Sequence, residues 1–126
     1  MLRRSLVVVS LLLLIPMSTF AAGVKNLTSP QVKTFLAQKK DAFLLDVRTP
    51  DEYRQAHLHG AVLIPLSELG ARLNSVPKNR PVVVYCAVGA RSASAAAMLV
   101  EKGFRDVYHM TDGIVGWYRN GFPIER

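Results

Sequence analysis

Cys86 is the residue of this sequence whose type and surroundings most directly suggest chemistry. It follows a β-branched apolar run at residues 81–85 and begins a short loop of small residues that ends at Arg91. An alanine-rich pattern typical of a helix starts at Ser92. Loop N–H groups and a helix N-terminus both stabilise negative charge, so this order favours the Cys86 thiolate and attracts oxyanions. The alternative from these residues alone is a small buried cysteine at a strand end.

Two other features of the loop bear on this chemistry. Arg91 adds a permanent positive charge at the end of the loop, and Gly89 suits a sharp turn whose amides point inward. Cys86 is the only cysteine of the chain, which therefore cannot form an internal disulfide. An oxidised Cys86 must be regenerated by a small thiol or by another protein.

The elements that must position this loop alternate along the chain from Lys25 onward. Short apolar runs alternate with helical patterns, which is typical of an α/β domain with a mostly parallel central sheet flanked by helices. We expect strands at residues 42–47, 61–64, 81–85 and 106–110. We expect helices at residues 29–40, 50–53, 67–73, 92–102 and 113–120. The Cys86 loop then lies between a central strand and a helix N-terminus.

Length and composition exclude several classes of protein. A chain of 126 residues, 50% of them hydrophobic, suits one globular domain and shows no biased tract. Sixteen Lys and Arg against nine Asp and Glu give a formal charge of +7, which can attract small anions. The basic residues are scattered and no base-stacking aromatic pattern accompanies them, so we expect no nucleic-acid partner.

The first residues predict a secretory signal peptide. Arg3 and Arg4 precede a ten-residue stretch at 6–15 that is apolar except for Ser10, and small residues follow. We expect a signal peptide over residues 1–21, with cleavage after Ala21 or Ala22, and an exported protein that is periplasmic or secreted. An uncleaved membrane anchor is the alternative, but the stretch is short for a spanning helix. After cleavage we expect no stable membrane insertion.

Three stretches of the chain carry patterns that occur together in one known family. Residues 44–53 read LLDVRTPDEY, followed by HLHGA at 57–61 and IP at 64–65. Residues 86–91 read CAVGAR with a serine next, and residues 112–124 contain DGIVGW and GFPI. In this order, they resemble the rhodanese (thiosulfate sulfurtransferase) superfamily, in particular its small single-domain exported members. The resemblance implies one rhodanese-like domain over residues 25–126.

Two positions depart from the pattern of that superfamily. Ala56 stands where glycine usually precedes the histidine, and Leu63 stands where asparagine usually precedes Ile-Pro. Both lie outside the loop that starts at Cys86. They put the local turn geometry near Pro65 in question and leave the nucleophile unaffected.

The resemblance implies a two-step transfer of sulfur. The Cys86 thiolate takes the outer sulfur of a small anionic donor such as thiosulfate, holds it as a persulfide, and passes it to a thiol or cyanide. Arg91 is the expected ligand of the donor's anionic end. The expected backbone N–H donors are those of Ala87, Val88, Gly89 and Ala90. The reaction needs no metal and no organic cofactor.

Other residues near strand ends have weaker claims to the site. Asp46 and Arg48 follow an expected strand, where α/β proteins build sites, but we expect structural roles for both. In these roles Arg48 pairs with Glu52, and Asp46 supports the loop backbone. Trp117 is expected to pack in the core of the last helix, with a pocket wall as the alternative.

The three histidines are expected to be structural. His57 and His59 lie two residues apart without a third ligand, which is poor spacing for a metal site. Turn and surface roles are expected for both of them. The same kind of role is expected for His109 near a strand end.

Two other functions remain open from the sequence. A cysteine-dependent phosphatase or arsenate reductase also places a cysteine loop before a helix, but its signature has five residues between Cys and Arg. Here four residues separate Cys86 from Arg91, and Ser92 occupies the phosphatase arginine position. A persulfide carrier that serves an exported thiol protein, or a non-catalytic binding module, is the other alternative.

Overall fold

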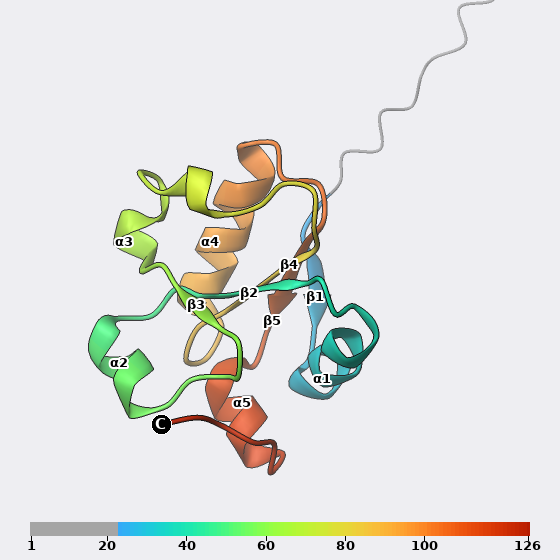
Figure 1. Ribbon diagram of the computed structural model, residues 1–126, viewed down its shortest axis with the longest axis vertical. Helices are drawn as coiled ribbons and strands as arrows, with labels where there is room; N and C mark the ends of the chain where they lie inside the picture. Colours follow the sequence, from blue (N-terminus) through green and yellow to red (C-terminus); the bar gives the residue numbers. More distant parts are fainter. Residues whose placement is uncertain (1–22) are drawn as a thin grey trace, which may run out of the picture.

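A five-stranded sheet, parallel throughout, runs through the computed structural model, which describes residues 23–126 (Figure 1). Its spatial order is β1-β5-β4-β2-β3, so β4, which leads to Cys86, is the central strand. The strands are β1 (Lys25–Leu27), β2 (Phe43–Asp46), β3 (Val62–Leu63), β4 (Val82–Tyr85) and β5 (Val107–Met110). The expected α/β fold class with helices around a mostly parallel sheet is confirmed.

Helices cover both faces of this sheet. The helices are α1 (Ser29–Gln38), α2 (Pro50–Gln55), α3 (Leu66–Leu69), α4 (Ala90–Glu101) and α5 (Gly113–Arg119), with a short 3₁₀ turn at Leu73–Ser75. Because side chains alternate along a strand, Val82 and Val84 of β4 pack with α3 and α4. Val83 and Tyr85 pack on the other face with α1 and α5. All four side chains are at most 1% exposed, as expected for a central parallel strand.

Three local predictions differ from the structure. The sequence analysis did not predict the edge strand β1. It has only three residues, two of which, Lys25 and Asn26, are polar and exposed, and it is defined by its pairing with β5. The single helix expected at 67–73 is wrong: α3 ends at Leu69 and a separate 3₁₀ turn begins at Leu73. Gly70 stands at the break, where glycine weakens a continuous helix.

The third difference concerns the start of α4. The helix begins at Ala90, two residues earlier than predicted, with Gly89 as its N-cap. Arg91 therefore lies in the first turn of the helix and not in the loop before it. From this position, the Arg91 side chain reaches Glu52 of α2.

The predicted signal peptide at residues 1–21, with its cleavage after Ala21 or Ala22, lies outside the described residues. Within residues 23–126, no helix is long and apolar enough to cross a membrane.

Candidate active site

The Cys86 thiol lies at the carboxyl end of β4 and is surrounded by hydrogen-bond donors. Cys86 is 1% exposed, and the N–H groups of Gly89 and Ser92 donate to its Sγ over 3.2 and 3.3 Å. The Ser92 hydroxyl lies 3.2 Å from the same sulfur. Burial raises the pKa of Cys86, but hydrogen bonds from Ser92, Gly89 and Val88 outweigh burial and lower it overall. The site therefore favours a thiolate, as the sequence predicted.

Gly89 makes the turn that brings these donors together. Its φ is +107°, a conformation that side chains with a Cβ rarely adopt. A Cβ at this position would lie 2.3 Å from the Thr111 carbonyl oxygen. Glycine is therefore required here both by the left-handed backbone and by the close approach of the chain after β5.

The opposite side of the loop is bound by the start of α5. The carbonyl oxygens of Cys86 and Ala87 accept from the N–H groups of Ile114 and Val115 over 2.9 and 3.1 Å. Gly113 permits this approach, because its φ is +62° and a Cβ there would lie 2.2 Å from the Ala87 oxygen. The loop is thus fixed with its carbonyls toward α5 and its amides toward the sulfur.

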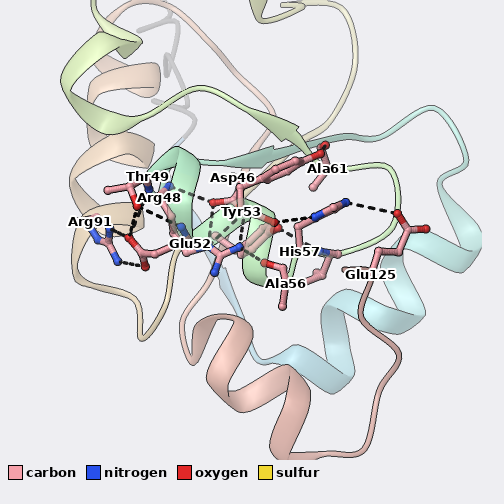
Figure 2. Close-up of polar contacts among 12 residues, drawn as sticks. Asp46, Arg48, Thr49, Glu52, Tyr53, Ala56, His57, Ala61, Arg91 and Glu125 are labelled. Carbon is pink, nitrogen blue, oxygen red and sulfur yellow. Dashed lines mark hydrogen bonds and ion pairs between the residues drawn. The ribbon is translucent and has the colours of Figure 1, made fainter.

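Arg91 reaches across the site to α2. Its two terminal nitrogens donate to the two carboxylate oxygens of Glu52 over 2.7 and 2.9 Å (Figure 2). Glu52 also forms the capping box of α2 with Thr49. The Arg91 hydrogen bonds, followed by those of Thr49, lower the pKa of Glu52 to about 2 despite partial burial. Arg91 is permanently charged and interacts electrostatically with Cys86, and its ion pair with Glu52 also joins α2 to α4.

A second ion pair joins Arg48 to Asp46. The Arg48 side chain donates to the carboxylate of Asp46 from Nε and from one terminal nitrogen, and the bond from the terminal nitrogen is 2.7 Å long (Figure 2). Both residues are buried. The same guanidinium donates to the Ala56 carbonyl over 2.6 Å. Asp46 accepts from the backbone N–H of Arg48, so its expected support of the loop backbone is confirmed. The expected pairing of Arg48 with Glu52 is wrong, because Glu52 pairs with Arg91.

The two departures from the superfamily pattern are accommodated locally. Ala56 has φ −166°, an extended backbone that any residue adopts, so glycine is not needed there. Leu63 lies in β3 in register with Asp46. The next residue, Ile64, donates its N–H to the Asp46 carbonyl over 2.9 Å. The turn before Pro65 is therefore held by backbone bonds and not by the side chain at position 63.

An open cavity of about 490 Å³ reaches the loop at Ala87. Ile114, Val115 and Tyr118 of α5 form an apolar part of its lining. Arg119 and Arg126 contribute positive charge, and neither forms an ion pair within residues 23–126. The cavity thus combines an apolar surface with unpaired cations beside the loop that holds the nucleophile.

The remaining candidates lie away from the sulfur. Trp117 is 6% exposed, packs edge-on against Phe122 and donates its indole N–H to the Pro123 carbonyl, and it does not line the cavity. Its expected core role is confirmed. His57 stacks on Tyr53 and joins the C-terminal segment through an isolated β-bridge to Glu125.

The sequence analysis did not identify two side chains near the thiol. It gave no role to Ser92, the residue after the CAVGAR motif. The surface or turn role expected for His109 is wrong. His109 is 6% exposed, and its Nε2 lies 2.7 Å from the Ser92 hydroxyl. The signal for Ser92 was its place in the first helical turn after the loop. No local signal marks His109, because β5 brings it to Ser92 through tertiary structure.

Fold and site together define an α/β protein with a buried, hydrogen-bonded cysteine at a strand-to-helix turn. The rhodanese-like domain family matches residues 28–120. A sulfurtransferase of Allochromatium vinosum is 38% identical over 80% of this chain and 94% of its own length. The thiosulfate sulfurtransferase GlpE of Coxiella burnetii is 37% identical over 65% of this chain and 77% of its own.

The fold comparison agrees with the sequence comparison. A rhodanese-related protein of Thermoplasma volcanium superposes with a TM-score of 0.72 at 28% identity, over 80% of this chain and 97% of that one. The chain belongs to the rhodanese-like domain family, and its relatives support a rhodanese-type sulfurtransferase in general. The resemblance seen in the sequence is confirmed.

We expect Gly113→Ala to destabilise the protein by more than about 3 kcal/mol, because a Cβ collides with the loop backbone and left-handed φ adds strain. Gly121→Ala is the matched control, since Gly121 also has positive φ (+74°) but open space around it. That control should lose about 1 kcal/mol. Urea unfolding of both variants measures the difference, and equal losses would show that the Gly113 contact with the loop is unimportant.

We expect Glu52→Gln to be less stable than the wild type at pH 6, with the deficit shrinking as pH falls. The folded-state pKa of Glu52 is lowered from 4.5 to about 2, so its stabilisation is present above 4.5 and is lost as pH falls toward 2. Urea midpoints between pH 6 and pH 2.5 measure this. Glu101→Gln, at an exposed glutamate that forms no ion pair within residues 23–126, controls for the loss of one charge. A deficit independent of pH would contradict the ion-pair explanation.

Proposed function

We propose that this protein transfers the sulfane sulfur of thiosulfate or a similar donor to a thiol or cyanide through a Cys86 persulfide. The observation that carries the proposal is the buried Cys86 sulfur with three hydrogen-bond contacts from Gly89 and Ser92 and a lowered pKa. Such a sulfur is a thiolate nucleophile and also a stabilised leaving group. Both properties are needed, because Cys86 attacks in one step and departs in the next.

The first step forms one sulfur–sulfur bond and breaks another. The Cys86 thiolate attacks the outer sulfur of thiosulfate, and sulfite leaves with the electron pair of the broken bond. The outer sulfur stays on Cys86 as a persulfide anion. Loop amides and the N-terminus of the 12-residue helix α4 favour negative charge at this position. Arg91, close to Cys86, is the proposed ligand of the donor's anionic end.

The second step returns the thiolate. An acceptor thiolate attacks the outer sulfur of the persulfide, forms a new persulfide, and releases Cys86 as the leaving group. The cavity beside Ala87 has a volume of about 490 Å³, in the range of sites for organic ligands and far larger than cyanide needs. Its apolar lining, together with Arg119 and Arg126, which form no ion pair within residues 23–126, favours an organic thiol with negative charge as the acceptor.

The relatives support the choice of donor and of reaction. The Coxiella burnetii protein is named a thiosulfate sulfurtransferase, and we extend that donor to this chain. The four-residue spacing between Cys86 and Arg91 disfavours a phosphatase. A carrier that passes persulfide to one exported protein uses the same intermediate and differs only in its acceptor.

We expect the purified protein to gain one sulfur, about 32 Da, when treated with thiosulfate, because nucleophilic catalysis leaves a covalent intermediate. Cyanide or a small thiol added next should remove it. Intact-mass spectrometry measures both changes, with Cys86→Ser as the control that gains nothing. A persulfide on Cys86→Ser, or none on the wild type with any sulfane donor, would reject the proposal. The same spectrum tests whether the exported chain starts at Ala22 or Gly23.

We expect Arg91→Ala to raise the KM for thiosulfate about tenfold, the loss expected for one charge-assisted hydrogen bond. Glu52→Gln is the matched control, since it breaks the same ion pair but leaves the guanidinium and its charge in place. Steady-state kinetics should therefore show a raised KM for Arg91→Ala alone. Equal effects of the two variants would make Arg91 a brace for α2 and remove it from donor binding.

A further inference from the structure

A chain of hydrogen bonds links the Cys86 thiol to the edge of the sheet. The Ser92 hydroxyl lies 3.2 Å from Cys86 Sγ and 2.7 Å from His109 Nε2. His109 Nδ1 lies 3.2 Å from the side-chain oxygen of Asn26 in β1. His109 is buried within β5, in register with Val84 of β4 and with Asn26. The mechanism above does not use His109 at all.

The surroundings of His109 determine which ring nitrogen carries a proton. Nε2 lies 3.1 Å from the Gly89 carbonyl oxygen, which can only accept a hydrogen bond. A lone pair on Nε2 would face that oxygen unfavourably, so Nε2 is the protonated nitrogen. Nδ1 of a neutral ring then accepts, which requires the Asn26 amide to be turned over so that its NH₂ group takes the place of the oxygen that faces Nδ1.

This protonation state restricts the hydroxyl of Ser92. The hydroxyl proton has three neighbours that could accept it: Cys86 Sγ, His109 Nε2 and the Gly89 oxygen, the last at 3.1 Å. An N–H at Nε2 removes the histidine as an acceptor. Together with the Ala93 N–H, which donates to the Gly89 oxygen over 3.0 Å, it uses both lone pairs of that oxygen. The sulfur, when it is a thiolate, is the strongest acceptor that remains.

We propose that His109 is a positioning residue which, through an Nε2–H donor, directs the Ser92 hydroxyl proton onto the Cys86 sulfur. The Ser92 hydroxyl then stabilises the thiolate before attack and again when Cys86 departs from the persulfide. The second role rests on the proposed sulfur transfer, whereas the effect on the thiol itself does not. His109 acts without touching the reacting sulfur.

The groups around this chain of hydrogen bonds are consistent with a neutral imidazole at His109. Burial lowers the pKa of His109, partly offset by its bond to Gly89. The groups that contact its ring from α4, from the loop and from β1 are Ser92, Gly89 and Asn26, all uncharged. The ion pair of Arg91 with Glu52 lies on the side of α4 that faces α2. It acts on the thiol through charge and remains present in every His109 variant.

The tautomer can be measured on the unaltered protein. Nitrogen-15 chemical shifts of the imidazole should show His109 with a protonated Nε2 and an unprotonated Nδ1 at pH 7.5. A neutral ring protonated at Nδ1 would overturn the proposal, because Ser92 would then donate to His109 and not to the sulfur.

The coupling can be measured with a double-mutant cycle read out as the pKa of the Cys86 thiol. Alkylation rates against pH give that pKa without any sulfur donor. Ser92→Ala should raise it by about one unit, the loss of one hydrogen bond to a charged group. His109→Leu should raise it by about half a unit, since the hydroxyl then divides its proton between acceptors. In the Ser92→Ala background, His109→Leu should have no further effect.

Two controls separate positioning from a general loss of structure. His109→Gln keeps an N–H donor near the position of Nε2 and should restore a thiol pKa close to the wild type. His57→Gln, a histidine that bonds to Tyr53 away from the thiol, should leave that pKa unchanged. An unchanged thiol pKa in His109→Leu, or a shift that persists without the Ser92 hydroxyl, would overturn the proposal. Either result leaves the persulfide test of sulfur transfer unaffected.

Discussion

The backbone of the loop that follows β4 is hydrogen-bonded on both sides, and the site depends on this constraint. Buried N–H and C=O groups must be paired, and here the carbonyls of Cys86 and Ala87 pair with the start of α5. The amides of Gly89 and Ser92 are then free to face the sulfur. The thiolate is favoured because the loop cannot turn these donors away without losing its bonds to α5.

The same constraint explains why two glycines are needed at this point of the fold. Gly89 and Gly113 both have positive φ, and a Cβ at either would meet backbone oxygen at 2.3 and 2.2 Å. The loop, the end of β5 and the start of α5 are packed backbone to backbone, with no side chain between them. The Cys86 thiol is therefore positioned by rigid main chain, and the proposed persulfide would need no rearrangement of this loop.

Around this loop, the two arginines have different tasks because they differ in burial. Arg48 is buried with Asp46, where an unpaired charge would be costly, and its remaining donor satisfies the Ala56 carbonyl. Arg91 is partly exposed where it pairs with Glu52, so its charge stays solvated and pairing costs less desolvation. The buried pair holds the chain after β2, and the exposed pair joins α2 to α4 beside the thiol.

The sequence by itself determined the cysteine loop, the order of most elements and the family, because each of these is encoded in neighbouring residues. Strand and helix periodicity, Gly89 and the CAVGAR motif are all local signals. Only the tertiary structure decided which acid each arginine meets, that β1 is a strand, and that Asn26 and His109 lie beside Ser92. The contacts of Arg91, Asn26 and His109 join residues 17 to 83 positions apart. They follow from the sheet order, which sets β2 and β5 beside β4 and β1 beside β5. No local pattern carries that order, since it results from how helices on both faces bury the sheet.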